Sequence, residues 1–236
     1  MIHTHCNSPV STRPRGLAQA RAALRGALAM LVLAALAATV GAAPASPAVI
    51  SLGSLNGPNG FRIDGRSPGD RAGRTVGNAG DVNGDGLDDL IIGVSAAAPD
   101  GQQGAGEVYV VFGSTANPAA LPLAALNGAN GFRLVGATFN DAAGESVSGA
   151  GDVNGDGYAD VIIGAPGADP GGIFEAGAAY IVFGAPSFPA RVNLADLNGD
   201  NGFRLNGIAE DDGAGVSVGG AGDMNGDGLD DLLVGA

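Results

Sequence analysis

Short apolar runs separated by polar turns make up the chain after residue 50. Within one stretch these runs predict four strands, bounded by clusters of Gly, Pro, Asn and Asp. No segment of this part has a convincing helical period, since Leu121 to Leu126 is short and contains a proline. The pattern therefore predicts an all-β protein. The four strands are expected near residues 146–149, 160–164, 178–183 and 203–206.

Several of the apolar runs are continuous and do not alternate with polar residues. They are Leu90-Ile91-Ile92, Val161-Ile162-Ile163 and Leu232-Leu233-Val234, and such runs leave neither face of a strand for water. Because no helices are predicted to cover the sheets, we expect sheets to stack on sheets, as the blades of a β-propeller do. Small residues between the runs suit close stacking, although they fit a β-sandwich too.

Three sequence markers recur with a single period of 71 residues, so the chain contains an internal repeat. The first marker is an Asn-Gly-x-Asn-Gly-Phe-Arg segment, the second is an Asp-rich loop, and the third is a Tyr-x-Val-Phe-Gly strand. Each repeat is expected to form one unit that stacks on its neighbours. The markers begin at Asn56, Asn127 and Asn198, at Asp81, Asp152 and Asp223, and at Tyr109 and Tyr180, respectively.

The Asp-rich loop has the donor spacing of a calcium site. In its first copy, Asp81, Asn83, Asp85 and Asp89 occupy positions 1, 3, 5 and 9, and the backbone carbonyl of Leu87 stands at position 7. Oxygen donors without nitrogen or sulfur select Ca²⁺ over zinc or copper. We therefore expect one Ca²⁺ in each of three loops. The other two ligand sets are Asp152, Asn154, Asp156, the Tyr158 carbonyl and Asp160, and Asp223, Asn225, Asp227, the Leu229 carbonyl and Asp231.

Other readings of these loops fit the sequence less well. An EF-hand needs a glutamate at position 12, where this chain has Ile92, Ile163 and Val234. RTX loops recur every nine residues, whereas these recur every 71. Plain Asx turns explain one copy but not three identical donor sets. A structural ion is favoured over a catalytic one because no base lies beside the loop. The position-8 acids, Asp88 and Asp230, are expected outside the coordination shell.

The loop lies within a longer motif that resembles a known family. From Gly144 to Pro166 the chain reads Gly-x-Ser-Val-Ser-x-Ala-Gly-Asp-x-Asn-x-Asp-Gly-x-x-Asp-Val-Ile-Ile-Gly-Ala-Pro, and the unit ends in Phe183-Gly184. This run resembles the FG-GAP repeat of integrin α subunits and of bacterial secreted proteins. The resemblance extends from about Ile50 to the end. It implies a β-propeller, usually of seven blades, with Ca²⁺ in the hairpin loop between the first two strands of a blade.

The repeats and the resemblance together predict a partial β-propeller of about two and a half FG-GAP blades plus a closing strand. Such an arrangement leaves open sheet edges, which further blades of a longer chain or self-association would cover. The expected segments are a signal peptide at 1–43, a closing strand and linker at 44–73, FG-GAP repeats at 74–144 and 145–214, and a truncated third repeat at 215–236.

The first residues have the features of a secretory signal peptide. Four arginines up to Arg25 precede an apolar run from Ala27 to Val40, and small residues follow. The run has fourteen residues, fewer than the ~20 that span a bilayer. We expect cleavage after Ala43 or Ala45, a secreted or cell-surface location, and no membrane insertion after cleavage.

Removal of this leader changes the available chemistry. The only cysteine and both histidines lie within the first six residues, so the mature chain has no thiol, disulfide or imidazole base. An exported domain without disulfides needs another staple, and bound metal is one. All 24 acidic residues follow the leader while four of the 11 basic residues lie in it, so the mature net charge is more negative than the −13 of the whole chain. Nucleic acid is therefore not an expected partner.

The resemblance implies a non-catalytic module for adhesion or recognition, whose loops bind an extracellular protein or glycan. No catalytic residue is predicted. The alternative is an accessory propeller of a secreted hydrolase, phospholipase D-like or glycan-active, because FG-GAP repeats also accompany such domains. Paired carboxylates could in principle hydrolyse glycosides, but the clustered acids of this chain already have a metal-binding explanation.

Overall fold

The computed structural model describes residues 51–236, so the expected signal peptide and the start of the 44–73 segment lie outside the described residues. The all-β prediction is confirmed, since this part contains thirteen strands and, as its only helices, five short 3₁₀ turns. No helix within it is long and apolar enough to cross a membrane. The turns are η1 (Leu52–Ser54), η2 (Pro99–Gly101), η3 (Leu123–Ala125), η4 (Pro170–Gly172) and η5 (Leu194–Asp196).

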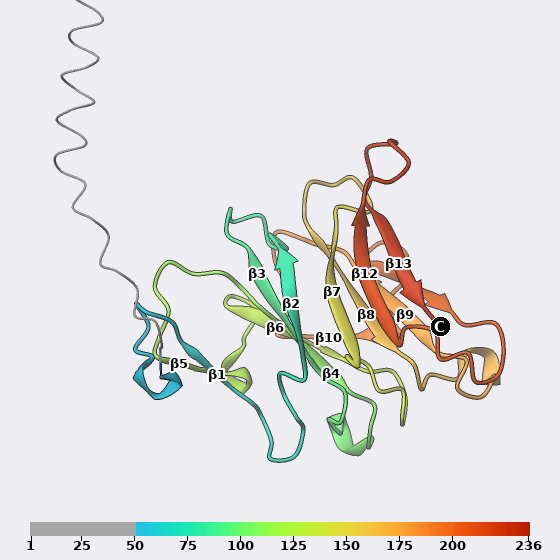
Figure 1. Ribbon diagram of the computed structural model, residues 1–236, viewed down its shortest axis with the longest axis horizontal. Helices are drawn as coiled ribbons and strands as arrows, with labels where there is room; N and C mark the ends of the chain where they lie inside the picture. The colour runs from blue at the N-terminus through green and yellow to red at the C-terminus, as the bar shows by residue number, and fades with distance from the viewer. Residues whose placement is uncertain (1–50) are drawn as a thin grey trace, which may run out of the picture. The chain divides into compact units, whose positions relative to one another are not determined.

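The first blade is an antiparallel sheet in which β2, β3, β4 and β6 lie side by side in that order (Figure 1). A fifth strand from the next repeat, β10, pairs with β6 in parallel, and β1 and β5 make the same parallel pair one repeat earlier. The loop after each third strand thus reaches back to the preceding unit. The bounds are β1 (Arg62–Asp64), β2 (Thr75–Gly80), β3 (Asp89–Val94), β4 (Glu107–Val111), β5 (Ala120–Pro122), β6 (Gly131–Val135) and β10 (Arg191–Asn193).

The second blade repeats the order of the first, and two strands of a third follow. All four strands predicted for the second unit are confirmed, with ends that differ by no more than two residues. Strands β5 and β10 were not predicted, because three residues are too few to show an alternation of apolar and polar positions. The bounds are β7 (Ser146–Gly151), β8 (Asp160–Ala165), β9 (Ala178–Val182), β11 (Gly202–Asn206), β12 (Ser217–Gly222) and β13 (Asp231–Gly235).

The blades stack face to face, which makes the described part a partial β-propeller. The first strand of each blade packs on that of the next, β2 on β7 and β7 on β12. Between the first two blades, Ile91 and Phe132 meet Val161 and Tyr180 in one fully buried core. Equivalent hydrogen bonds also link successive blades. Thr75 Oγ1 donates to the Gly144 carbonyl, and 71 residues later Ser146 Oγ donates to the Gly215 carbonyl, both at 2.8 Å.

The expectation that the apolar runs are covered on both faces holds only for the middle blade. Val161, Ile162 and Ile163 are all fully buried. Leu90 in the first blade is 41% exposed and Leu233 in the third is 57% exposed, so for these two the prediction is wrong. The reason is geometric: among residues 51–236, the middle blade alone has a sheet stacked on each face.

Candidate metal centre

All three Asp-rich loops occupy the same place in the fold, the hairpin between the first two strands of a blade. They join β2 to β3, β7 to β8 and β12 to β13, and they lie at one end of the blades (Figure 1). Neighbouring loops are hydrogen-bonded to each other. The Ala159 amide donates to the Asp81 carbonyl, and the Asp230 amide donates to the Asp152 carbonyl, both at 3.1 Å. The repeat therefore places the predicted ligand sets side by side.

The position-1 acid of each loop organises the turn. Asp152 Oδ1 accepts hydrogen bonds from the amides of Gly155 at 2.7 Å and Asp156 at 3.1 Å, and its Oδ2 accepts one from Gly157 at 2.9 Å. Asp223 accepts from the three corresponding amides of its own loop, and Asp81 accepts from two of them, those of Asp85 and Gly86. The amides of each loop thus point inward to the position-1 carboxylate, which holds the tight turn together.

Positions 3 and 5 continue this pattern. Asn154 Oδ1 accepts from the Asp156 amide at 3.0 Å, and Asn154 Nδ2 donates to Asp156 Oδ2 at 2.8 Å. Asp156 Oδ1 then accepts from the Tyr158 amide at 2.9 Å. Gly157 at position 6 has φ of 90°, which explains why this position is glycine in every copy. The Asn83–Asp85 pair repeats these contacts in the first loop.

The position-9 acids have a structural role that their spacing did not predict. Asp160 is fully buried and accepts hydrogen bonds from the amides of Val153 at 2.9 Å and Gly184 at 2.8 Å. Asp89 is held in the same way by Val82 and by Gly113. These acids tie the loop to the end of the third strand. The available signal was the Gly that follows Phe at a constant 24 residues after the acid.

Burial affects the charge of these position-9 acids. It raises the pKa of Asp89 and of Asp160 to about 6, although two amide hydrogen bonds on each carboxylate act in the opposite direction. Nearby carboxylates at positions 1 and 5 raise the pKa further. Asp231 in the third loop is half-buried and accepts from the Met224 amide at 2.7 Å. Its loop has no following blade beside it in the described residues.

The position-7 residues contact the preceding loop. The ring of Tyr158 lies over Gly84, where an added Cβ would be 2.6 Å from it, and the side chain of Leu229 lies over Gly155, where an added Cβ would be 3.0 Å from it. These glycines stand at position 4 of the first and second loops, so side-chain packing adds to the hydrogen bonds between loops. The carbonyl oxygens of Leu87, Tyr158 and Leu229 remain predicted ligands.

The residues fit a calcium ion by the chemistry of their donors. Within residues 51–236 no three acidic, histidine or cysteine side chains already form a metal-binding cluster, because the loop carboxylates are turned toward backbone amides. Those bonds still leave room for a cation on Oδ2 of Asp152 and of Asp223, because each of these oxygens accepts a single hydrogen bond and keeps a lone pair. Every donor in the loops is oxygen, as Ca²⁺ prefers. Asp81, Asp152 and Asp223 with the donors at positions 3, 5, 7 and 9 would hold one ion each.

Comparison with known proteins agrees with the repeat. Two segments match the FG-GAP repeat model, residues 72–111 and 143–182. Each matched segment holds the first three strands of a blade and its Asp-rich loop, β2 to β4 in one and β7 to β9 in the other.

Two curated relatives are integrin α subunits. Integrin alpha-PS2 of Drosophila melanogaster is 33% identical over 128 residues, which cover 54% of this chain and 9% of the relative. Integrin alpha-M of Mus musculus is 36% identical over 103 residues, which cover 42% of this chain and 8% of the relative. The chain thus spans about a tenth of the length of these relatives. Together with the repeat matches, they support a resemblance to the integrin-α-like FG-GAP proteins.

Proposed function

We propose that this chain is a calcium-binding β-propeller module that recognises an extracellular protein or glycan and is itself non-catalytic. The observation that carries the proposal is the recurrence of an oxygen-only loop at the same hairpin of three successive blades. When bound, calcium would supply positive charge to a loop that carries three predicted carboxylate ligands. The chain's own residues position those carboxylates through backbone amides and present a rigid stack of blades from which other loops extend.

A location outside the cell follows from the same proposal. The first residues predict a secretory signal peptide, and the two relatives are named as integrin α subunits. Extracellular calcium modules typically bind the ion at about 10⁻⁴ to 10⁻³ M, so loops of this kind fill outside a cell. A secreted or cell-surface protein is the location that fits both.

The buried acids support a non-catalytic role for this part of the chain. Each of the four in residues 51–236 accepts hydrogen bonds from internal donors. Glu107 accepts from Arg133 Nη1 at 2.8 Å and from the Tyr109 hydroxyl, and Asp141 accepts from the amide and hydroxyl of Thr138. Burial raises the pKa of both acids, but neither is free to act on a substrate. An attached hydrolase domain remains the second candidate function.

The test uses the purified full chain with calcium and with chelator. Binding is measured against arrays of extracellular-matrix proteins and of glycans, and activity is measured against phosphodiester and glycoside substrates. The proposal predicts binding that chelation weakens, without turnover of any substrate. Turnover that a loop substitution such as Asp156→Ala abolishes would contradict the non-catalytic role. Binding that is unaffected by chelator would show that recognition does not depend on calcium, against the proposal.

A further inference from the structure

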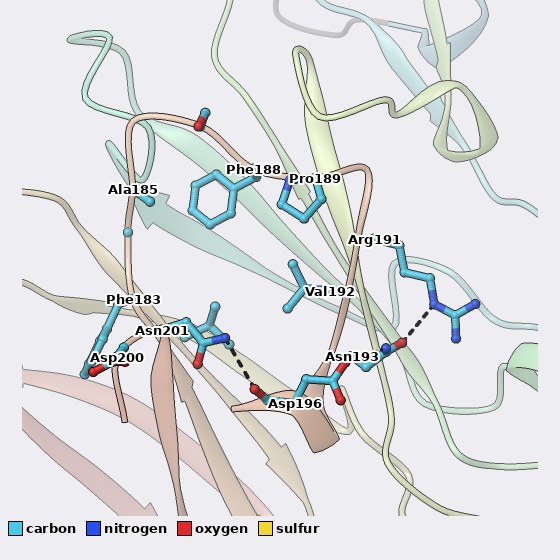
Figure 2. A pocket seen from close by; sticks show the side chains of 13 residues that line it. Phe183, Ala185, Phe188, Pro189, Arg191, Val192, Asn193, Asp196, Asp200 and Asn201 are labelled. Carbon is cyan, nitrogen blue, oxygen red and sulfur yellow. Dashed lines mark hydrogen bonds between the residues drawn. The ribbon is translucent and has the colours of Figure 1, made fainter. Parts of the chain in front are cut away.

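The second repeat forms a surface pocket of about 370 Å³ in the loop that joins β9 to β11 (Figure 2). Phe188 and Val192 make its apolar wall, and both also pack against the core between the first two blades. The Phe188 ring stacks on Phe132 of the first blade with 4.1 Å between ring centroids and 6° between planes. Asp196 and Asp200 lie across from this wall. The pocket thus joins a fixed apolar surface to two exposed carboxylates.

The first repeat provides an internal comparison for this pocket. Positions that carry its apolar anchor and its polar groups are different in the equivalent loop 71 residues earlier. There, small or apolar residues replace the arginine, one asparagine and both aspartates, and an asparagine replaces the phenylalanine. The second-repeat residues are Phe188, Arg191, Asn193, Asp196 and Asp200, and their first-repeat equivalents are Asn117, Ala120, Pro122, Ala125 and Ala129. The blade fold therefore does not require these side chains.

Two carboxylates of the pocket keep free acceptors, whereas its arginine and one asparagine donate to neighbouring side chains. Arg191 pairs with Asp100 outside the pocket and donates Nε to Asn193 Oδ1 at 2.9 Å, as Figure 2 shows. Asn193 Nδ2 donates to Asp196 Oδ2 at 2.7 Å. Within residues 51–236 no hydrogen bond or ion pair reaches the carboxylate of Asp200 or the second oxygen of Asp196. A ligand that donates hydrogen bonds would therefore match these free acceptors.

The free carboxylate oxygens and the apolar wall favour one kind of ligand. An anion would meet two carboxylates on a strongly acidic chain, and a neutral sugar would bring no charge to balance them. An ammonium or guanidinium group only donates, and its aliphatic stem would lie along the apolar wall. We propose that this pocket binds a lysine or arginine side chain of a partner polypeptide. The inference deepens the proposed recognition function and rests on it.

The experiment is a titration of the isotope-labelled full chain, followed by amide NMR shifts at about 10⁻³ M Ca²⁺, the extracellular level that fills such loops. The probe is the blocked tripeptide acetyl-Gly-Arg-Gly-amide, and the control probe replaces arginine by its neutral isostere citrulline. We expect saturable shifts in the 183–201 loop with the arginine peptide alone. The double substitution Asp196→Ala and Asp200→Ala, which installs the first-repeat residues, is expected to weaken binding about tenfold or more.

Control variants keep the outcome interpretable. Glu210→Gln removes one exposed charge away from the pocket and should leave the dissociation constant unchanged. Equal binding of the arginine and citrulline peptides, or equal weakening by Glu210→Gln, would overturn the proposal, as would shifts produced only by a neutral oligosaccharide. Failure of the pocket with calcium binding intact would leave the proposed function standing. Loss of calcium binding with peptide binding intact would contradict the proposed calcium-binding function and leave the pocket standing.

Discussion

The contact between blades gives the sharpest test of the architecture. Gly164 on β8 faces the neighbouring blade, and a Cβ built on it would lie 1.9 Å from the Gly215 carbonyl oxygen and 2.3 Å from Ser146 Oγ. Those two atoms are the partners of the hydrogen bond that links the second and third blades. Gly164→Ala must therefore push the blades apart and break that bond.

The expected cost follows from these two effects. Overpacking a close contact costs about 1–3 kcal/mol, and a lost hydrogen bond adds about 1 kcal/mol. The free energy of unfolding should fall by about 2–4 kcal/mol, which for a domain of this size lowers the melting temperature by roughly 5–15 °C. The assay is thermal unfolding followed by circular dichroism in calcium. Hydrogen exchange should locate the loss in β12 and β13.

A matched control makes the result decisive. Gly219 on β12 has an ordinary backbone conformation, and its added Cβ meets no atom within 4 Å. Gly219→Ala should change stability by no more than about 0.5 kcal/mol. If Gly164→Ala is as mild as this control, the close stacking of blades at β8 is refuted.

Three further outcomes are expected, all measured by thermal unfolding. In chelator, Asp160→Ala should destabilise more than Asp156→Ala, by about 1–3 kcal/mol, because it strands two backbone amides whatever the metal does; equal losses would contradict the structural role. Ala159→Asp should stabilise the chain by about 0.5–1.5 kcal/mol and leave calcium affinity nearly unchanged, because Asp230 at the same position of the third loop accepts an amide of the preceding loop; a large change in affinity would place position 8 among the ligands. Phe188→Asn, the first-repeat residue, should cost about 1–3 kcal/mol through the lost ring stack; a neutral result would show that the stack contributes nothing.

The fold could be predicted from the sequence because the repeat has a constant length. A marker that returns every 71 residues fixes the boundaries of a unit, and the continuous run at Val161 to Ile163 requires sheets on both faces. Leu90 and Leu233 carry the same pattern yet are partly exposed, because a local pattern cannot count how many blades stand beside it. The pairing of β10 with β6 was also inaccessible, since it depends on where a loop crosses to the preceding blade.

The candidate site was accessible in its residue types but not in its hydrogen bonds. Spacing alone predicts Asp160 as a metal ligand at position 9. Its burial and the hydrogen bond that it accepts from the Gly184 amide depend on the end of the third strand, 24 residues further along the chain. The contact of Asp230 with the Asp152 amide was likewise invisible, because it joins two repeats. The residues of the pocket at Phe188 do carry a signal in the sequence, because they differ from their equivalents 71 residues earlier.

The central claim is that the repeated loops bind calcium, and calorimetric titration of chelator-stripped full chain tests it most directly. We expect up to three ions per chain with dissociation constants of about 10⁻⁴ to 10⁻³ M, and a melting temperature that rises as the loops fill. Asp156→Ala should remove one ion and leave the others. Fewer than two ions per folded chain, or a melting temperature indifferent to chelator, would contradict it.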